Sequence, residues 1–260
     1  MPTGAFTGYI DVAQVVLYAF WIFFFGLIIY LHRENKREGY PLDSDRTART
    51  DRVKVQGFPA IPRPKTFITA HGGAVDVPSD VRQDRRAIAA VAVEGHPGSA
   101  YQPTGNPMLD AVGPASYAMR ADEPDLTIDG RPKIVPLRVA TDYHVDTRSP
   151  NPIGLPVYGG DGVVGATVRD VWVDLSEPQI RYYELEVAAN GRRVLVPATF
   201  TTISRSRGRV TVRSIMSHHF ADVPGLQNPD RVTLREEDRI CGYYGGGTLY
   251  AEESRLGPLL

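Results

Sequence analysis

The feature that most constrains this chain is an uncharged apolar run near its N-terminus. From Val12 to Leu31 the sequence contains no Asp, Glu, Lys or Arg, and Gln14 is its only strongly polar side chain. A helix over this run would be about 30 Å long, which matches the hydrocarbon thickness of a bilayer. A cleaved signal peptide would instead need a basic start, a shorter apolar run and a small-residue cleavage site. The run therefore predicts a membrane-spanning helix.

The charges on either side of the run predict its orientation. Asp11 precedes it, whereas Arg33, Lys36 and Arg37 follow it closely. Basic flanks of membrane helices stay in the cytoplasm. We therefore expect a single-pass protein with its N-terminus in the periplasm and its large C-terminal part in the cytoplasm.

Composition excludes several other classes of protein. The formal net charge of -1 provides no basic field for nucleic acid, so a nucleic-acid partner is not expected. Cys241 is the only cysteine, which rules out an internal disulfide and a cysteine-based zinc site.

The region after the membrane run changes in character along the chain. Residues 33–54 mix basic and acidic side chains without an apolar period, as expected of an arm under lipid headgroups. About half of the 21 prolines lie between Gly57 and Pro136, where long helices and central strands are therefore improbable. This stretch is either disordered or an extended chain ordered on partner proteins. Its apolar residues, such as Phe58 and Tyr101, favour the second alternative.

A mainly β domain is predicted from Lys133 onward. Asn190-Gly191 is its clearest turn signal and predicts a two-residue type I′ hairpin. A small barrel or folded antiparallel sheet of five or six strands follows from this pattern. A C-terminal helix is predicted over 232–244, ended by Gly245 to Gly247. The predicted strands are short runs rich in β-branched and aromatic residues, at 134–139, 167–173, 182–187, 194–200 and 209–213.

These patterns divide the chain into five expected parts. They are a periplasmic N-terminus (1–11), a transmembrane helix (12–32), a juxtamembrane arm with an extended proline-rich segment (33–132), a cytoplasmic β-barrel domain with the C-terminal helix (133–247) and a C-terminal tail (248–260).

Catalytic and cofactor motifs are missing from the sequence. It has no dinucleotide or P-loop fingerprint, no HExxH and no GxSxG. His218 and His219 beside Asp222 form the nearest approach to a metal site, but adjacent residues point in different directions and no third ligand converges on them. We therefore predict no catalytic, cofactor-binding or metal-binding residues in this chain.

Carboxylates in the β region carry the more interesting chemistry. Asp170, Asp174 and Glu177 lie in one strand and its following loop, with Arg181 four residues beyond Glu177. Alternation places Asp170 and Asp174 on the same face as Trp172. They are either a salt-bridged rim of the barrel or a chain of groups that accept and release protons near a membrane site. The residues alone leave both alternatives open.

Several phrases together resemble one family, the H subunit of the photosynthetic reaction centre of purple bacteria. The resemblance covers nearly the whole chain, and six matches in the same order make it specific. They are the span with its exit FWIFFFGLIIYLHRENKREGYPL, PKTF at Pro64 to Phe67, GNPMLDAVGPASY at Gly105 to Tyr117, NPIGLPVYG at Asn151 to Gly159, VRDVWVD at Val168 to Asp174 and EEDRICGYYGGGTLY at Glu236 to Tyr250.

The resemblance implies a non-catalytic subunit that caps the two pigment-binding subunits in the intracytoplasmic membrane of a bacterium. Such a chain stabilises the quinone region and helps to deliver protons to the secondary quinone. Bacteriochlorophyll, bacteriopheophytin, quinones and non-haem iron are then expected in the partner subunits and not in this chain. A cytochrome subunit, light-harvesting antenna and membrane lipids are further expected partners.

The resemblance also implies a set of proton-transfer residues. The inner cluster of the family falls on Asp174, Glu177 and Arg181, the acid at the proton entrance on Asp129, and a nearby lysine on Lys133. Some family members carry two histidines just after that aspartate, where this chain has Gly130, Arg131 and Pro132. We therefore expect protons to enter through Asp129 alone or by another route.

Two other functions compete with this interpretation. A membrane-anchored adaptor with a protein-binding β-barrel would purify in a colourless complex, whereas a reaction-centre subunit would purify with pigmented partners. An anchored hydrolase would need a nucleophile and a base, for which the sequence shows no motif.

Overall fold

The computed structural model describes residues 4, 10–40, 57–71, 73–79, 84, 86–96 and 99–256. The chain forms two compact units, residues 1–81 and 82–260, and each is described by itself. The part of the expected juxtamembrane arm from residue 41 to residue 56 lies outside the described residues.

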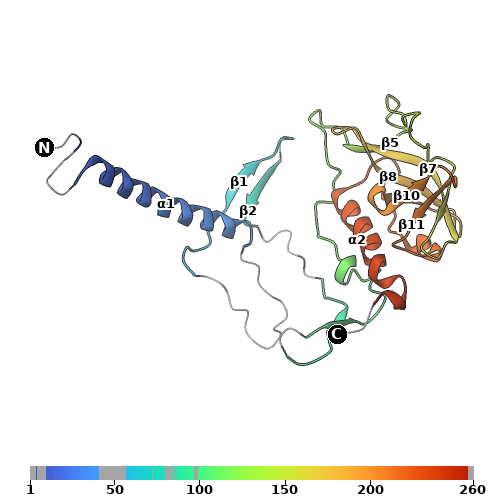
Figure 1. The fold of residues 1–260 in the computed structure, drawn as a ribbon, viewed down its shortest axis with the longest axis horizontal. Coiled ribbons are helices and arrows are strands. Elements are labelled where there is room, and N and C mark those ends of the chain that lie inside the picture. Colours follow the sequence, from blue (N-terminus) through green and yellow to red (C-terminus); the bar gives the residue numbers. More distant parts are fainter. Residues whose placement is uncertain are drawn as a thin grey trace. The chain divides into compact units, whose positions relative to one another are not determined.

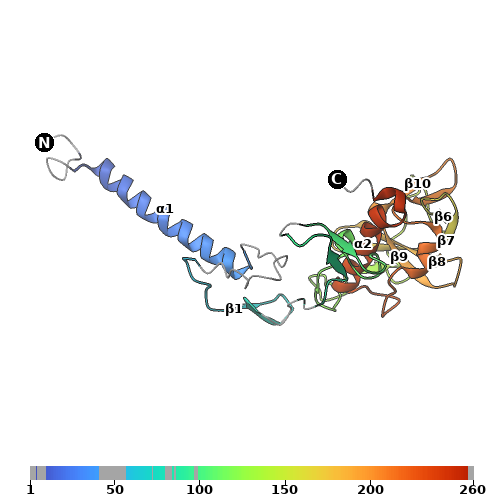
Figure 2. The same ribbon diagram turned by 90° about the horizontal axis from the view of Figure 1, so that it is seen from below.

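The first unit is dominated by α1 (Val12–Arg37), drawn in blue in Figures 1 and 2. The Asp11 carboxylate accepts a hydrogen bond from the backbone N–H of Gln14, and the Gln14 side chain accepts one from the N–H of Asp11, which starts the helix with a capping box. Gly39, at φ +92°, ends it in a Schellman turn in which the N–H of Tyr40 donates to the carbonyl of Asn35. Among the described residues, α1 is the one helix that is long enough and apolar enough to cross a membrane, and its apolar stretch is not buried by protein.

The C-terminal turn of α1 is fixed to the residues that follow it in the same unit. The ammonium group of Lys36 donates to the carbonyl oxygens of Gly57 and Pro59. The guanidinium of Arg37 donates to the carbonyls of Arg63, at 2.6 Å, and Val77, at 3.0 Å. Both basic side chains are therefore buried by protein. The antiparallel strands β1 (Lys65–Ile68) and β2 (Ala74–Val77) complete the unit.

The second unit contains a seven-stranded sheet. Its order is β10-β11-β6-β7-β8-β9, with β5 also paired to β7. All pairs are antiparallel except β11 with β6. The strands are β5 (Ile134–Pro136), β6 (Pro156–Tyr158), β7 (Val164–Asp174), β8 (Gln179–Val187), β9 (Arg193–Pro197), β10 (Thr201–Ser204) and β11 (Arg209–Val212).

The sheet confirms the predicted mainly β domain but not its closure. In the described part of the chain β9 and β10 are the two ends of the strand order and do not pair, so no closed barrel forms. The predicted strand over 194–200 ends at Pro197, where the short 3₁₀ helix η2 (Ala198–Phe200) turns the chain toward β10. Strands β6 and β10 were not predicted.

The β8–β9 hairpin forms where Asn190-Gly191 predicts it, but the predicted turn type is wrong. Gly191 adopts φ +68°, whereas Asn190 is not among the residues with positive φ. A type I′ turn needs both. The N–H of Gly191 donates to the carbonyl of Val187, and the N–H of Val187 donates to the carbonyl of Arg192. The loop is therefore longer than two residues.

The C-terminal helix α2 (Leu234–Tyr250) passes through the glycines that were predicted to end it. A Cβ on Gly246 would lie 2.5 Å from the Cβ of Ala115, and one on Gly247 would lie 2.5 Å from the carbonyl oxygen of Ser214. These glycines therefore permit close packing of α2 against η1 (Gly113–Ala115) and the segment after β11. Figure 1 shows α2 beside the sheet.

The core lies between α2 and the sheet. Ile240 and Tyr244 of α2 are fully buried, as are Trp172 of β7 and Leu185 of β8. The expected proline-rich segment contains short pieces of regular structure: the β3 (Ala90–Ala92) and β4 (Tyr101–Pro103) pair, and η1. The chain also forms η3 (Ser217–Asp222) before α2 and η4 (Glu253–Arg255) after it.

Candidate functional site

Asp174 is a buried carboxylate at the end of β7. Its side chain is only 2% exposed. The backbone N–H groups of Ser176 and Glu177 donate to its Oδ1 at 2.9 and 3.1 Å, because the chain turns there toward β8. Its Oδ2 lies 3.8 Å from the Nζ of Lys133 and 3.8 Å from a guanidinium nitrogen of Arg181. Two N–H groups and two cations therefore compensate the charge of this buried acid.

The strand pairing explains how Lys133 and Arg181 reach Asp174. Strand β5 pairs with β7 so that Ile134 lies opposite Asp174, and Lys133 immediately precedes Ile134. On the other side, β8 pairs with β7 through an irregularity between Trp172 and Val173 that sets the position of Arg181. The pairing of β5 and β8 with β7 thus places one cation on each side of Asp174.

Further acids extend this group in two directions. The Nζ of Lys133 lies 3.5 Å from the carboxylate of Asp125. Arg181 lies 3.9 Å from Oε2 of Glu237 on α2, which also accepts a hydrogen bond of 2.7 Å from the hydroxyl of Tyr182. We call Asp125, Lys133, Asp174, Arg181, Tyr182 and Glu237 the Asp174 cluster.

Glu237 and Tyr182 are the members of this cluster whose pKa values depart clearly from their ordinary values. Burial raises the pKa of the Glu237 carboxyl, while the hydrogen bond from Tyr182 and the charge of Arg181 act in the opposite direction. Burial also raises the pKa of Tyr182, and the carboxylate of Glu237 adds to that shift. The Tyr182 hydroxyl therefore stays protonated and acts as the donor.

The structure places Glu177 beside this cluster but exposed. Its backbone N–H donates to Asp174, whereas its carboxylate accepts a long hydrogen bond of 3.4 Å from the side chain of Gln179. Among the described residues no ion pair joins Glu177 to Arg181, although the sequence spacing suggested one.

Asp129 lies apart from the cluster, on an exposed loop. Its side chain is 69% exposed and lies 3.6 Å from the guanidinium of Arg131. A groove of about 1090 Å³, which we call the Asp129 groove, is lined by both of these residues and by Leu175 and Ser176 of the turn after β7. The groove thus extends from the predicted entrance acid to the residues next to Asp174.

Two family models match this chain. The model described as photosynthetic reaction centre, H-chain N-terminal region matches residues 4–139, slightly more than half of the sequence, and the PRC-barrel domain matches residues 145–218. This chain belongs to the photosynthetic reaction centre H-chain family. The H chain is a non-catalytic subunit, which agrees with the missing catalytic motifs and excludes the hydrolase alternative. Its α1 helix is consistent with a single-pass membrane anchor.

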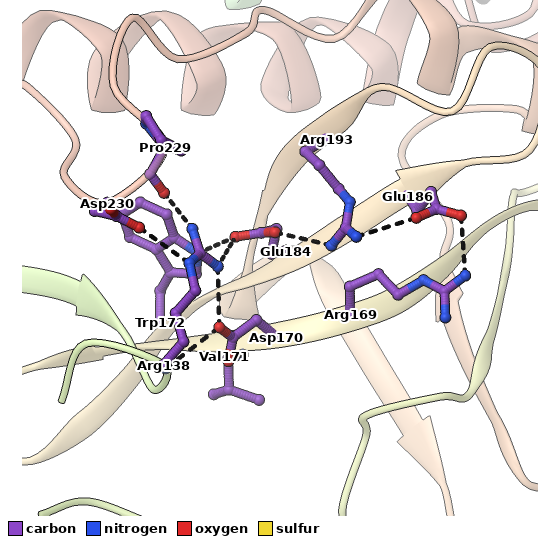
Figure 3. A network of polar contacts seen from close by, with 10 residues as sticks. All are labelled: Arg138, Arg169, Asp170, Val171, Trp172, Glu184, Glu186, Arg193, Pro229 and Asp230. Carbon is purple, nitrogen blue, oxygen red and sulfur yellow. Dashed lines mark hydrogen bonds and ion pairs between the residues drawn. The ribbon is translucent and has the colours of Figure 1, made fainter. Parts of the chain in front are cut away.

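Asp170 of the H chain belongs to a second polar network, shown in Figure 3. Arg138 donates to Asp170 at 3.0 Å and to Glu184 at 2.7 Å, and the indole N–H of Trp172 donates to the same carboxylate of Glu184. The guanidinium of Arg138 also lies over the ring of Trp172, 6.0 Å from its centre, so Asp170 and Trp172 both contact Arg138, which agrees with their predicted common face. The network also includes Pro229, Asp230, Arg193, Glu186 and Arg169.

His218 and His219 lie on η3. The Nδ1 of His219 accepts a hydrogen bond from the backbone N–H of Met216, and burial lowers the pKa of this imidazole. Within the described ranges there is no group of three His, Cys, Asp or Glu side chains that could hold a metal ion.

Sequence reasoning missed three members of the Asp174 cluster: Asp125, Tyr182 and Glu237. Glu237 lies in the first turn of α2, where acids usually serve the helix terminus. The signal for its second role is nonlocal, because Tyr182 is 55 residues away along the chain.

Proposed function

We propose that this H chain caps the pigment-carrying subunits on the cytoplasmic side of the membrane, stabilises their quinone region and passes protons toward the secondary quinone. Membership of the H-chain family supports the role as a subunit. Bacteriochlorophyll, bacteriopheophytin, the quinones and non-haem iron would be held by partner subunits, with this chain binding none of them.

Exposed apolar side chains support the capping role. Ile128 is 95% exposed, and Val139, which also lines the Asp129 groove, is 49% exposed. Ile128 and Val139 line the same groove, and exposed apolar side chains that are grouped in this way mark sites of interaction. An interface of this kind would cover more than about 1,000 Å².

The Asp174 cluster carries the proposal of proton transfer. Reduction of the secondary quinone consumes two protons, and a site within the membrane needs carriers between it and bulk water. Asp129 would take up protons at the exposed end of the Asp129 groove. Asp174, with Lys133 and Arg181 on either side, would pass them on, and exposed Glu177 beside the same turn would be a second carrier.

The test is Asp174→Asn in the assembled reaction centre. Asparagine keeps the shape and removes the group that binds a proton. We expect the proton-coupled second electron transfer to slow by about tenfold or more, as for the loss of a general acid or base, while primary charge separation is unchanged. Glu177→Gln should slow the same step less, because the Glu177 carboxylate has no ion pair with the cluster. Flash kinetics from neutral to alkaline pH measure both steps.

The matched control is Asp170→Asn. Asp170 lies on the same strand and is also buried beside an arginine, but it belongs to the network around Arg138. Asp170→Asn should lower the stability of the chain and leave the rate of the second electron transfer unchanged. If Asp174→Asn and Glu177→Gln both match the wild type with the quinone site occupied, the cluster is only a structural salt bridge.

A further inference from the structure

A separate groove in the second unit is lined by four arginines and no acidic residue. It has a volume of about 390 Å³ and lies between the end of β6, the following glycine-rich turn, the β10–β11 hairpin and η4. Its arginines are Arg207, Arg209, Arg213 and Arg255, and we call it the arginine groove.

Most of this positive charge is uncompensated. Of the four arginines, Arg255 alone forms an ion pair within the described part of the chain, with Glu252 at 3.5 Å. Asp161 lies in the neighbouring turn, but its carboxylate accepts hydrogen bonds from the hydroxyl and the backbone N–H of Ser217. Because the whole chain has a net charge of -1, this concentration of arginines is local and not a general property of the surface.

Two of the arginines are held in place by the fold. Arg255 donates to the carbonyl oxygens of Ser214 and Gly247, both at 2.8 Å, and to that of Arg213 at 3.0 Å. A Cβ at Gly160 would lie 2.8 Å from the Arg255 guanidinium, so a glycine leaves space for it. The guanidinium of Arg209 lies over the ring of Tyr158, 5.0 Å from its centre. A site that is organised before binding loses less entropy on binding.

Hydroxyl groups accompany the arginines. Thr202, Ser204 and Thr211 line the groove. An adjoining hollow of about 320 Å³ shares Thr202, Arg213 and Arg255 with it and is also lined by Ser214. The hydroxyl of Ser214 is buried and has no hydrogen-bond partner among the described residues. A buried hydroxyl without a partner is uncommon in folded proteins.

We propose that the arginine groove binds a phosphate group. A phosphate monoester carries nearly two negative charges and several acceptor oxygens, which suits several guanidinium forks and neighbouring hydroxyls. A single carboxylate would leave most of this positive charge without a partner. The headgroup of an anionic lipid and a small soluble phosphate present the same chemical group, and the experiment separates them.

The first arm measures binding of inorganic pyrophosphate to the full-length chain in neutral detergent by titration calorimetry at low salt. We expect saturable binding that the double substitution R207Q/R213Q weakens by about tenfold or more, since each charge-assisted contact contributes strongly. R207K/R213K should bind with intermediate affinity. The matched control R205Q removes one arginine from the same hairpin outside the groove, where it donates to the carbonyl of Arg148, and should change the affinity less than about twofold.

The second arm uses the full-length chain in nanodiscs of phosphatidylcholine with or without phosphatidylglycerol. Slower hydrogen exchange in β10 and β11 only with phosphatidylglycerol would support a lipid headgroup as the source. Protection only after pyrophosphate is added would support a soluble phosphate. The proposal is overturned if pyrophosphate does not bind, if folded R207Q/R213Q binds it as wild type does, or if polyglutamate alone protects the hairpin, which would indicate an acidic protein partner.

Discussion

Asp170 and Asp174 lie on one strand, yet they belong to different polar networks. Asp170 shares Arg138 with Glu184, and Arg138 also binds Asp230, so this network joins the turn after β5, the strands β7 and β8 and the chain before α2. Asp174 lies instead between Lys133 and Arg181, at the end of the strand nearest the Asp129 groove. Asp174→Asn is therefore the test of proton transfer, and Asp170→Asn is its control.

Glu237 should make the stability of the chain depend on pH. Because its pKa is raised in the folded state, the folded chain keeps this proton to a higher pH than the unfolded chain does. Its contribution is therefore most favourable below the unfolded value near pH 4.3 and is lost as the pH rises through the folded pKa. Glu237→Gln should remove this loss and flatten the dependence, as measured by thermal unfolding of the full chain in detergent from pH 4 to pH 8.

A matched control for this prediction is Glu253→Gln, at the start of η4, where the glutamate is exposed. Glu253→Gln should leave the pH dependence of stability as it is in the wild type. If stability depends more steeply on pH in Glu237→Gln than in the wild type, the prediction is wrong. The contacts with Tyr182 and Arg181 would then influence the pKa of this carboxyl more than burial does.

Helix α2 shows how a local pattern and nonlocal packing compete at the scale of one element. Three successive glycines are a strong stop signal, and by local propensity the helix should end before them. The close approach of Ala115 and Ser214 to Gly246 and Gly247 reverses this expectation, because only a residue without a Cβ fits there. The interpretation of the glycines as a stop was wrong, because the residues that require them, Ala115 and Ser214, lie about 130 and about 30 residues earlier in the chain, and no pattern within the helix contains them.

The N-terminus of α2 offers a prediction about stability. The hydroxyl of Thr233 accepts a hydrogen bond from the N–H of Glu236 and donates one to Asp122, while the Glu236 carboxylate accepts from the N–H of Thr233. Thr233→Ala should lower the free energy of unfolding by about 1–2 kcal/mol through loss of this capping box. Chemical denaturation of the full chain in detergent measures it. Thr248→Ala, near the other end of the helix, should cost less than about 0.5 kcal/mol, and equal losses would contradict the capping role.

The sheet and the site differ in how far the sequence could predict them. Long strands such as β7 and β8 bury alternating or continuous apolar residues, so their existence was readable from local pattern. The family resemblance pointed to Lys133, Asp174 and Arg181, and the strand register brings these three together. Tyr182 and Glu237 join them only through the packing of α2 on the sheet, which local sequence does not encode.

At the scale of the whole molecule, the basic residues at the C-terminal end of α1 have two physical roles. Arg33 is exposed, whereas Lys36 and Arg37 are buried by backbone carbonyls of residues 57–77 in the first unit. Their charges still oppose transfer of the helix end across a bilayer. Their hydrogen bonds also fix the chain that follows, so this end of α1 is both a charged flank and a folded structure.

This combination predicts the topology of the chain. In sealed vesicles with the cytoplasmic face outward, trypsin should digest the second unit, residues 82–260, and leave α1 protected by lipid. Arg33→Gln removes the exposed one of these three basic residues and should retain this orientation, because Lys36 and Arg37 remain. A periplasmic marker protein that stays intact shows that the vesicles are sealed, and its digestion after detergent is added shows that the protease is active. Full protection of the second unit in such vesicles would reverse the orientation and with it the proposal that the Asp174 cluster receives protons from the cytoplasm.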